Sequence, residues 1–414
     1  MSGQINKATD DYITRMVTFR MYPRSKQESE MVRILGLHCD LYNAALQERR
    51  DAHRMNGIRI TYGMQAKSLT EVRSFDSDYK SLNAQSEQAT LRRVDRAFKN
   101  FFERQKKGKP GGYPRFQSKQ RFSGWSYNAH GDGYKLLSDG KNGNVRISGV
   151  GLVRLRGEAR VFGTPTAATI SRKNGKWFLS ICMRFDSVEQ LSRQCGTEIN
   201  TFDWGVETFL TGSNGEEFWS IDNPRLGRSE LGQRLKYWQR ELARKKKGSR
   251  RFKQIKKIIA TIHEKLANKR KDFSHKESTK IVSRSAIIGT EELNIQVMTS
   301  AGRTDTGNPR KTRKRHLNRE ILDTAPSMFI QFIKYKAEEA GAWYVDVPTR
   351  TVKPSQRCSG CDDVRKKDLS ERIHSCKRCG LTLGRDQNSA ATMHKYVLNI
   401  IGPGTVPFAE TNVG

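Results

Sequence analysis

Acidic residues are few in this chain of 414 residues, in which 43 Asp and Glu stand against 76 Lys and Arg. The resulting net charge of +33 at pH 7 suits a polyphosphate partner, because each phosphate that a basic side chain neutralises releases counterions. Runs of about 18 apolar residues are absent, so no membrane-spanning helix is predicted. Residues 1–11 are polar and lack the apolar segment of a signal peptide. We therefore expect a cytoplasmic protein that binds nucleic acid and no membrane.

Cysteine is also sparse, and four of the seven cysteines form two C-x2-C pairs separated by 14 residues. These are Cys358, Cys361, Cys376 and Cys379. Two such pairs can surround one Zn²⁺ with four thiolates and leave no open position, so the sequence predicts one structural zinc ion. Redox disulfides are the alternative, which a reducing compartment disfavours. Cys39, Cys182 and Cys195 are expected to be buried thiols, and His374 is expected at the surface, outside the ligand set.

Three acidic residues stand at the ends of predicted elements. Asp203 and Glu291 close segments that read as strands, and Asp386 falls in the first turn of a predicted helix. Mg²⁺ prefers carboxylates together with water and phosphate oxygens. Two such ions, roughly 4 Å apart, can activate water and stabilise the leaving oxygen of a phosphodiester. Each acid alone is more often a solvated loop residue, but the three together predict a nuclease centre with two catalytic Mg²⁺ ions.

The order of the motifs carries a resemblance to a known family. A D-x-G hairpin, an E-[DE]-L-N strand end, the paired C-x2-C motifs and a D-x-N-x-A-A helix follow one another. In this order the chain resembles the transposon-encoded TnpB nucleases and the compact type V CRISPR effectors descended from them. Further segments that resemble the family are Leu41–Leu46, Ala97–Phe102, Gly112–Phe116 and, as a lid before the zinc module, Leu317–Asp323.

The resemblance implies a multidomain α/β fold: an RNase H-like RuvC nuclease domain with a zinc-ribbon insertion, and an N-terminal wedge β-barrel with an inserted helical recognition domain. The expected bounds are 1–23 and 118–195 for the wedge, 24–117 for the recognition domain, 196–351 and 383–401 for the nuclease, 352–382 for the ribbon and 402–414 for a disordered tail. Apolar spacing predicts a strand at Arg15–Tyr22 and helices at Lys26–Asn56 and Ser86–Arg104. Turn-separated alternating runs over Gly133–Phe185 predict a small β-barrel or sandwich.

The resemblance also assigns roles at the acidic site. Asp203, Glu291 and Asp386 would be the catalytic metal ligands. Successive strand side chains point to opposite faces, so Glu291 and Glu292 cannot both serve, and the family places the ligand first. Asn388 is expected either to support the geometry of this site or to cap the helix. Thr290 and Gly384 depart from the family pattern, but neither change removes a ligand, so an active nuclease is expected.

Basic residues concentrate in two regions. Residues 224–284 hold 21 Lys and Arg against 5 Asp and Glu, on two predicted helices broken near residues 247–250, and favour a surface for a guide–target duplex. Residues 106–122 mix basic and aromatic side chains, which suits phosphate neutralisation with base stacking, although a solvated linker is the alternative. Between residues 86 and 104, the apolar stripe is expected to be core, and the basic face to contact phosphates.

The candidate nucleic-acid contacts are residues whose side chains can neutralise phosphates or read base edges. They are Gln85, Gln88, Arg92, Arg93, Arg96, Lys106, Lys107, Arg115, Lys119, Arg240, Arg244, Lys245, Lys246, Lys247, Arg250, Arg251 and Arg270.

The function expected from the resemblance is an RNA-guided DNA endonuclease of a prokaryotic cytoplasm, associated with the nucleoid when on target. It would act as a monomer with one guide RNA on double-stranded DNA that carries a short flanking motif. A nuclease-dead guided repressor is one alternative, but such a protein should have lost an acid. A guide-free transposase or junction resolvase is another, which leaves the basic helices unexplained.

Overall fold

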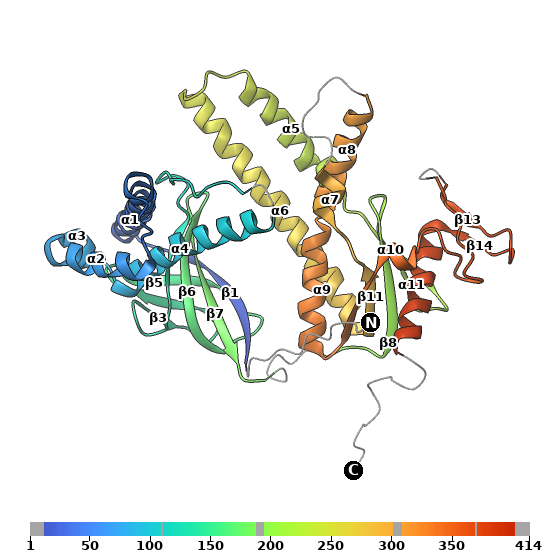
Figure 1. Ribbon diagram of the computed structural model, residues 1–414. Coiled ribbons are helices and arrows are strands. Elements are labelled where there is room, and N and C mark those ends of the chain that lie inside the picture. Colours follow the sequence, from blue (N-terminus) through green and yellow to red (C-terminus); the bar gives the residue numbers. More distant parts are fainter. Residues whose placement is uncertain (1–11, 109–110, 188–193, 301–308, 369–370, 402–414) are drawn as a thin grey trace, which may run out of the picture. The chain divides into compact units, whose positions relative to one another are not determined.

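The structure is a computed structural model that describes residues 12–108, 111–187, 194–300, 309–368 and 371–401 (Figure 1). The side chains of Ser300 and of residues 309–313 are also left undescribed. The tail expected at 402–414 lies outside the described residues. The chain forms two compact units, Met1–Ser187 and Val188–Gly414, and each is described by itself.

The first unit combines one sheet with a group of helices that follows its first strand. Its elements are β1 (Ile13–Tyr22), α1 (Ser25–Asn56), α2 (Tyr62–Phe75), α3 (Ser77–Ser81), α4 (Ala84–Lys106), β2 (Gly124–Tyr127), β3 (Tyr134–Leu137), β4 (Lys141–Ile147), β5 (Gly151–Glu158), β6 (Thr164–Lys173) and β7 (Lys176–Phe185). The strand predicted at the start of the chain and the two long helices are confirmed within a few residues.

The seven strands form a single sheet in the order β2-β6-β7-β1-β5-β4-β3, so the sandwich alternative is wrong. Strand β1 is central, pairing antiparallel with β7 from Ile13 to Met21 and with β5 near its end, as the sequence predicted. Alternate side chains of β7 are buried, from Trp177 to Phe185, which gives the sheet one apolar face. Among the described residues the hydrogen-bonded order ends at β2 and β3. These two edges meet through the rings of Tyr127 and Tyr134, 5.9 Å apart.

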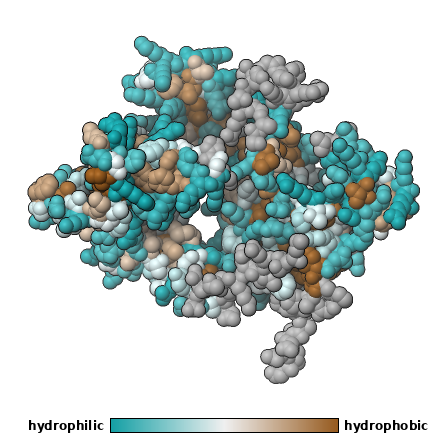
Figure 2. Space-filling model, viewed as in Figure 1, coloured by the Kyte–Doolittle hydropathy of each residue, from teal (hydrophilic) through white to brown (hydrophobic). Residues whose placement is uncertain are grey.

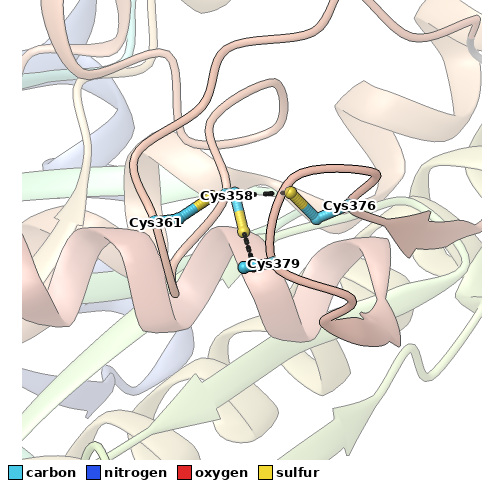
Figure 3. A group of neighbouring side chains, drawn as sticks. All are labelled: Cys358, Cys361, Cys376 and Cys379. Atoms are coloured by element: carbon cyan, nitrogen blue, oxygen red, sulfur yellow. Dashed lines mark hydrogen bonds between the residues drawn. The ribbon is translucent and has the colours of Figure 1, made fainter.

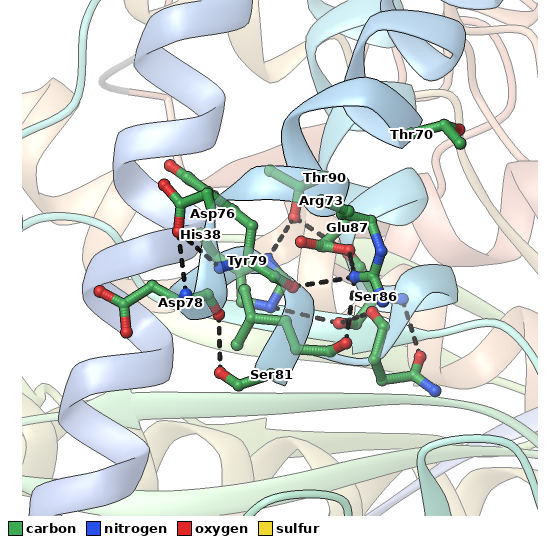
Figure 4. Close-up of polar contacts among 12 residues, drawn as sticks. His38, Thr70, Arg73, Asp76, Asp78, Tyr79, Ser81, Ser86, Glu87 and Thr90 are labelled. Carbon is green, nitrogen blue, oxygen red and sulfur yellow. Dashed lines mark hydrogen bonds and ion pairs between the residues drawn. The ribbon is translucent and has the colours of Figure 1, made fainter.

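Helices α2 and α3 were not predicted, because polar contacts hold them. Only Gln65 and Leu69 of α2 are buried. Arg73 donates hydrogen bonds to the carbonyls of Tyr79 and Leu82 and forms an ion pair with the fully buried Glu87 of α4 (Figure 4). Burial raises the pKa of Glu87 to about 7 against the opposing charge of Arg73. A buried polar network replaces the apolar stripe that sequence periodicity can detect.

The second unit contains a mixed sheet, long helices and a small two-stranded ribbon. Its elements are β8 (Glu198–Trp204), β9 (Thr208–Ser213), β10 (Phe218–Asp222), the 3₁₀ turn η2 (Leu226–Arg228), α5 (Glu230–Ala243), α6 (Arg250–Arg284), β11 (Ser285–Glu291), α7 (Ile295–Ser300), α8 (Pro309–Thr324), α9 (Pro326–Ala340), β12 (Trp343–Val347), α10 (Thr349–Val352), β13 (Ile373–Ser375), β14 (Thr382–Gly384) and α11 (Arg385–Ile401).

The five-stranded sheet has the order β10-β9-β8-β11-β12. The pairs β10–β9 and β9–β8 are antiparallel, whereas β8, β11 and β12 run parallel. Neighbouring residues of β11 enter different cores: Ile288 packs with Phe329 and Ile333 of α9, and Ile287 packs with Met393 and Val397 of α11. Helices α9 and α11 therefore cover opposite faces, and the alternation along each strand decides which side chains face α11.

Helices α5 and α6 form the predicted pair, with a break at residues 244–249. Their contact is apolar, with Leu226, Ile262 and Leu266 buried against Leu231 and Trp238. Farther along α6, Lys336 of α9 is fully buried, and its ammonium donates to the carbonyl of His275 at 2.6 Å and to the hydroxyls of Ser278 and Thr279 at 2.7 Å. A buried ammonium requires such acceptors, so this contact fixes α6 against α9.

Candidate active site and metal centre

The register of β8 and β11 brings Asp203 and Glu291 together. The parallel pairing runs through Thr201 opposite Gly289 and Phe202 opposite Thr290, so the next residues on the two strands are Asp203 and Glu291. Side chains in register on neighbouring strands share a face. Both acids also lie at the carboxyl ends of the parallel strands β8 and β11, the edge at which open α/β sheets bind ligands.

Helix α11 adds the third acid from the same face. The Thr201 hydroxyl donates to the carbonyl of Ala390 at 2.8 Å, and a Cβ at Gly289 would lie 2.8 Å from Val397, so glycine allows the close approach of the helix. Two residues farther along their strands, Asp203 and Glu291 share this face. Asp386 is in the first turn of α11, where the positive end of the helix dipole favours an acid.

The pKa values of Asp203 and Glu291 respond to burial and to their acidic neighbours. Burial raises the pKa of Asp203 well above its usual range, and the charges of Glu291 and Asp386 and a hydrogen bond with Glu291 add to the rise. Burial likewise raises the pKa of Glu291, and Asp386 adds to the rise, against the hydrogen bond with Asp203. Arg385 provides a counter-charge, with its Nε 3.5 Å from the Asp386 carboxylate. This excess of negative charge is the condition that a bound cation relieves.

Glu292 has a different setting from Glu291. Its side chain is exposed, its N–H donates to the carbonyl of Val347 at 3.0 Å, and its own carbonyl accepts from the Thr349 hydroxyl. The choice of Glu291 as the site residue therefore agrees with the pleat. Thr290 points to the opposite face, where its hydroxyl contacts that of Tyr344, which accounts for a polar residue at this position.

An open cleft of about 490 Å³ adjoins Asp386. It is lined by residues of β9, β14, the start of α11, the loop between β8 and β9 and the residue before β13, namely Glu207, Thr208, Thr211, Arg372, Gly384, Arg385, Asp386 and Gln387. Gln387 accepts from the N–H of Gly384 at 3.0 Å, and a Cβ at Gly384 would lie 2.8 Å from the accepting oxygen. The glycine that departs from the family pattern thus makes room for this contact.

The four cysteines of the paired motifs meet as predicted. The sulfur atoms of Cys358, Cys361, Cys376 and Cys379 all lie within 4.8 Å of one another (Figure 3). Sulfur–sulfur distances are 3.6 Å for Cys358–Cys379 and 3.5 Å for Cys361–Cys376, too long for disulfide bonds. The N–H groups of Cys379 and Arg378 lower the pKa of Cys376 to about 7, whereas burial raises the pKa of Cys358. Four converging thiols are the donor set of a structural zinc ion.

Asn388 joins the cysteine cluster to helix α11. It is fully buried, accepts from the N–H of Ser359 at 3.0 Å and donates to the carbonyl of Arg357 at 2.7 Å, the residues on either side of Cys358. Two residues along a helix turn by about 200°, so Asn388 and Asp386 face different sides. Its amide therefore holds the turn around Cys358, the first cysteine knuckle. This role differs from the two considered from the sequence, which were support of the acidic site and capping of the helix.

The expectations about His374 and about two of the three cysteines outside the cluster need correction. His374 is buried, with only 3% of its surface exposed, and its Nδ1 contacts the Lys367 ammonium. The surface position expected for it was wrong, although it lies outside the cysteine group, as predicted. Of the other cysteines Cys39 is buried, whereas Cys182 and Cys195 are only partly buried.

Most candidate nucleic-acid contacts are exposed, and Figure 2 shows hydrophilic residues over most of the face in view. Gln85, Gln88, Lys245 and Arg270 are partly buried. The exposed residues are Arg92, Arg93, Arg96, Lys106, Lys107, Arg115, Lys119, Arg240, Arg244, Lys246, Lys247, Arg250 and Arg251.

Some of these cations also have contacts within the protein. Arg270 donates to the carbonyl and carboxylate of Asp323 at 2.7 and 2.6 Å. Lys119 pairs with Asp40 at 2.7 Å, and Arg93 stacks over Phe122. Asp323, noted in the sequence only as the last residue of a lid segment, also accepts from the N–H of Gly227 at 2.7 Å. It therefore ties the end of α8 to η2 and α6.

Two family profiles match this chain. Residues 180–301 match OrfB_IS605, described as "Probable transposase", and residues 327–393 match the Cas12f1-like TNB domain. InsQ of Escherichia coli (strain K12), provisionally named an RNA-guided DNA endonuclease, is 29% identical over 377 residues, 90% of this chain and 89% of that protein. A Streptomyces pristinaespiralis protein with the same provisional activity name is 28% identical over 391 residues, 91% and 88% of the two chains.

A solved structure supports the same assignment at the level of fold. A chain in the cryo-EM structure of a Cas12f1–sgRNA–target DNA complex has a TM-score of 0.59 at 14% identity and covers 93% of this chain and 99% of that chain. The fold of this chain is therefore similar to that of the Cas12f1 chain. Together these matches support a TnpB-family protein, as the order of the motifs indicated. None of the helices in the described ranges is long and apolar enough to cross a membrane.

Proposed function

We propose that this protein is an RNA-guided DNA endonuclease that cuts through one acidic centre. The observation that carries the proposal is the convergence of Asp203, Glu291 and Asp386 from two strands and a helix on one face of the sheet. The provisional names of the two full-length relatives support the activity and the partners. In this proposal the second unit is the RuvC-like nuclease with its zinc ribbon. The first unit comprises the wedge and recognition domains, and it ends at Ser187, eight residues before the wedge bound expected from the sequence.

The acidic centre fits Mg²⁺ because its donors are carboxylate oxygens and because burial and the neighbouring acids raise the pKa values of Asp203 and Glu291. These two residues and Asp386 would hold the ions. Bound Mg²⁺ supplies charge stabilisation and water activation for phosphodiester hydrolysis. The chain itself contributes position: β8 and β11 fix two carboxylates in register, and α11 presents the third beside an open cleft.

The cysteine cluster fits one structural zinc ion, held by Cys358, Cys361, Cys376 and Cys379. All four positions of a tetrahedral ion would be filled, so its role is to fold the ribbon. Asn388 is on the same helix as Asp386, and its hydrogen bonds to Ser359 and Arg357 connect the folded ribbon to that helix.

The basic surfaces would hold the guide RNA and the target duplex. Exposed cations lie on α4, on the segment after it and around the α5–α6 turn. Base pairing with the guide RNA would select the target sequence. The protein would contact the sugar–phosphate backbone of the duplex and read a short flanking motif. Such contacts predict affinity that falls steeply with salt.

The test is to purify the protein after expression with its native flanking DNA and to sequence the RNA that accompanies it. The proposal expects one dominant RNA with a constant segment and a variable stretch of about 20 nucleotides. Heterogeneous cellular RNA, with specific DNA cutting that survives RNase treatment, would replace guided cleavage with a guide-free resolvase or transposase. Specific RNA with no cutting in Mg²⁺ would favour a guided repressor.

A further inference from the structure

The first unit contains a cavity of about 740 Å³ that the acidic centre does not use. It is lined by the end of α1, the segment Gly57–Thr61, the second half of α4 and Tyr113. This volume is within the usual range for sites that take a small organic ligand or a nucleotide. Three separate segments of the chain form its walls, so it is a cavity enclosed by the fold rather than a gap beside one helix.

Aromatic rings line one side of the cavity and reach its opening. Phe98 is buried, whereas Phe102 is 49% exposed and Tyr113 is 43% exposed. Tyr113 packs edge-on against Phe98, with 5.5 Å between ring centroids, and Phe102 lies 6.4 Å from Phe98 at a shallow angle. The apolar stripe of α4 is therefore core at its beginning and solvent-facing at its end. Flat, exposed and mutually supported rings suit stacking of a planar ligand.

Basic side chains surround the same opening. Arg59 and Lys106 are exposed and line the cavity, as does Lys99. Two acids also line it. Asp95 is held by Arg49 and Lys99 at 3.1 and 3.2 Å, and Glu103 is exposed. The cations exceed the acids, so an anionic ligand is favoured over a cationic one.

A buried guanidinium forms part of the cavity wall. Arg49 is only 8% exposed, and it is fixed by hydrogen bonds to Gln65 at 2.8 Å and Asp95 at 3.1 Å, with its Cζ 5.4 Å from the centroid of Phe98. Its Nη2 has no hydrogen-bond partner within the described residues. A buried donor without a partner is costly, and an acceptor on a ligand would complete its bonding.

We propose that this cavity receives one unstacked nucleobase, with the ring against Phe102 and Tyr113, the base edge toward Arg49 and the adjoining phosphate near Arg59 and Lys106. Stacking beside cations is how single-stranded nucleic acid is held without dependence on sequence. The inference rests on the proposed function, because it assumes a nucleic-acid partner. The base comes from the guide RNA or from unpaired target DNA, which share this chemistry.

The test compares Phe102→Ala with Phe75→Ala in the full chain bound to its guide RNA. Phe75, at the end of α2, is also an exposed phenylalanine, at 78%, and it does not line the cavity. Phe102→Ala should weaken binding of either the guide RNA or the target DNA by roughly 5- to 100-fold, the range for loss of one stacked base, and Phe102→Trp should restore it. Phe75→Ala should change both affinities by less than about twofold, because its ring is not part of the cavity.

Photocrosslinking identifies the source of the base. One sample carries 5-iodouridine throughout the guide RNA, and the other carries 5-iododeoxyuridine in the target DNA. A crosslink to Phe102 or Tyr113 in one arm, lost in Phe102→Ala, supports the cavity and names its ligand. Equal binding by Phe102→Ala and Phe75→Ala to the guide RNA and to the target DNA, without that crosslink, overturns the proposal even if guided cleavage is normal. A crosslink in a protein that never cuts DNA supports the cavity and overturns the proposed nuclease.

Discussion

The four cysteines of the metal cluster lie close together in the sequence, between residues 358 and 379. The three acids of the candidate active site are far apart in the sequence, with Asp203 on β8, Glu291 on β11 and Asp386 on α11. The thiols converge within one ribbon, where local N–H groups lower the pKa of Cys376 to about 7. The carboxyls converge only because strand register and helix packing bring them together, and their proximity raises the pKa of Asp203 and Glu291.

This difference separates a centre that stabilises its surroundings from one that its surroundings must hold. A closed set of four thiols contributes folding free energy when zinc binds. Like-charged carboxyls beside an open cleft oppose folding until a cation binds, which is typical of sites built for chemistry. Substitutions in the acidic centre should therefore affect activity more than stability, and substitutions in the cysteine cluster should affect stability more directly.

The largest expected effect is on catalysis. Asp203→Ala, Glu291→Ala and Asp386→Ala should each lower cleavage by roughly a thousandfold or more, because loss of a catalytic metal ligand removes several kcal/mol of transition-state stabilisation. Guided DNA binding should change little. Gel shifts and cleavage assays on the same samples measure both, and Glu292→Ala is the exposed neighbouring control. Substantial cutting by any of the three variants would remove that residue from the site.

Breaking the cysteine cluster should give the second-largest effect, through folding. Cys358→Ser or Cys379→Ser should release the zinc, unfold the ribbon and reduce cleavage by at least about tenfold, more than guide-RNA binding, because metal affinity is folding free energy in so small a module. Elemental analysis of protein never exposed to chelator should give near one zinc per chain in the parent and in the control Cys182→Ser. A parent protein without zinc would contradict the assignment.

Asn388→Ala tests the connection between the two centres and should have a smaller effect. Loss of its hydrogen bonds to Ser359 and Arg357 should cost on the order of 1–3 kcal/mol locally, since buried partners are left unsatisfied. Zinc content should stay near that of the parent, while the Mg²⁺ concentration needed for half-maximal cleavage rises several-fold. Asn399→Ala, exposed on the same helix, is the control. Zinc loss with an unchanged Mg²⁺ requirement would confine Asn388 to the ribbon.

The smallest effect concerns stability in the absence of metal. The pKa of Asp203 is raised by folding above its ordinary 3.8, so folding favours the protonated form, and that stability is lost as pH rises from about 4 through the raised folded-state pKa. In EDTA, Asp203→Asn should therefore raise the Tm at neutral pH, by about 2–4 °C per kcal/mol recovered, and should flatten its decline with pH. Addition of Mg²⁺ should reduce the difference in Tm between Asp203→Asn and the parent protein. A lower Tm for Asp203→Asn at neutral pH in EDTA would contradict the mutual repulsion.

The sequence was informative wherever a pattern is local. The cysteine spacing predicts the thiol cluster, and the apolar periodicity predicts α1 and α4 within a few residues. It failed where polar contacts between distant segments decide the outcome. Helices α2 and α3 are held through Arg73 and Glu87, and His374 is buried beside Lys367. The internal role of Arg270 depends on Asp323, 53 residues away, and a charge pattern alone cannot reveal such a partner.

In the candidate site, too, local patterns could be predicted from the sequence, whereas contacts between distant segments could not. Strand alternation correctly separates Glu291 from Glu292, because the pleat is a local property. The role of Asn388 could not be read from D-x-N, because its hydrogen-bond partners belong to the first cysteine knuckle, 29 and 31 residues away. The cavity around Arg49 depends on three segments that only the fold assembles.

The most direct test of the account is guide-redirected cleavage by the purified protein–RNA complex. Two linear duplexes share the flanking motif but differ in target sequence, and two guides match one duplex each. We expect each guide to direct cutting of its own duplex in Mg²⁺ and EDTA to stop the cutting. Asp386→Ala with the matching guide should bind the duplex without cutting it. Cutting that ignores the guide, or that persists at the parent rate in Asp386→Ala, would contradict a guided nuclease with this acidic centre.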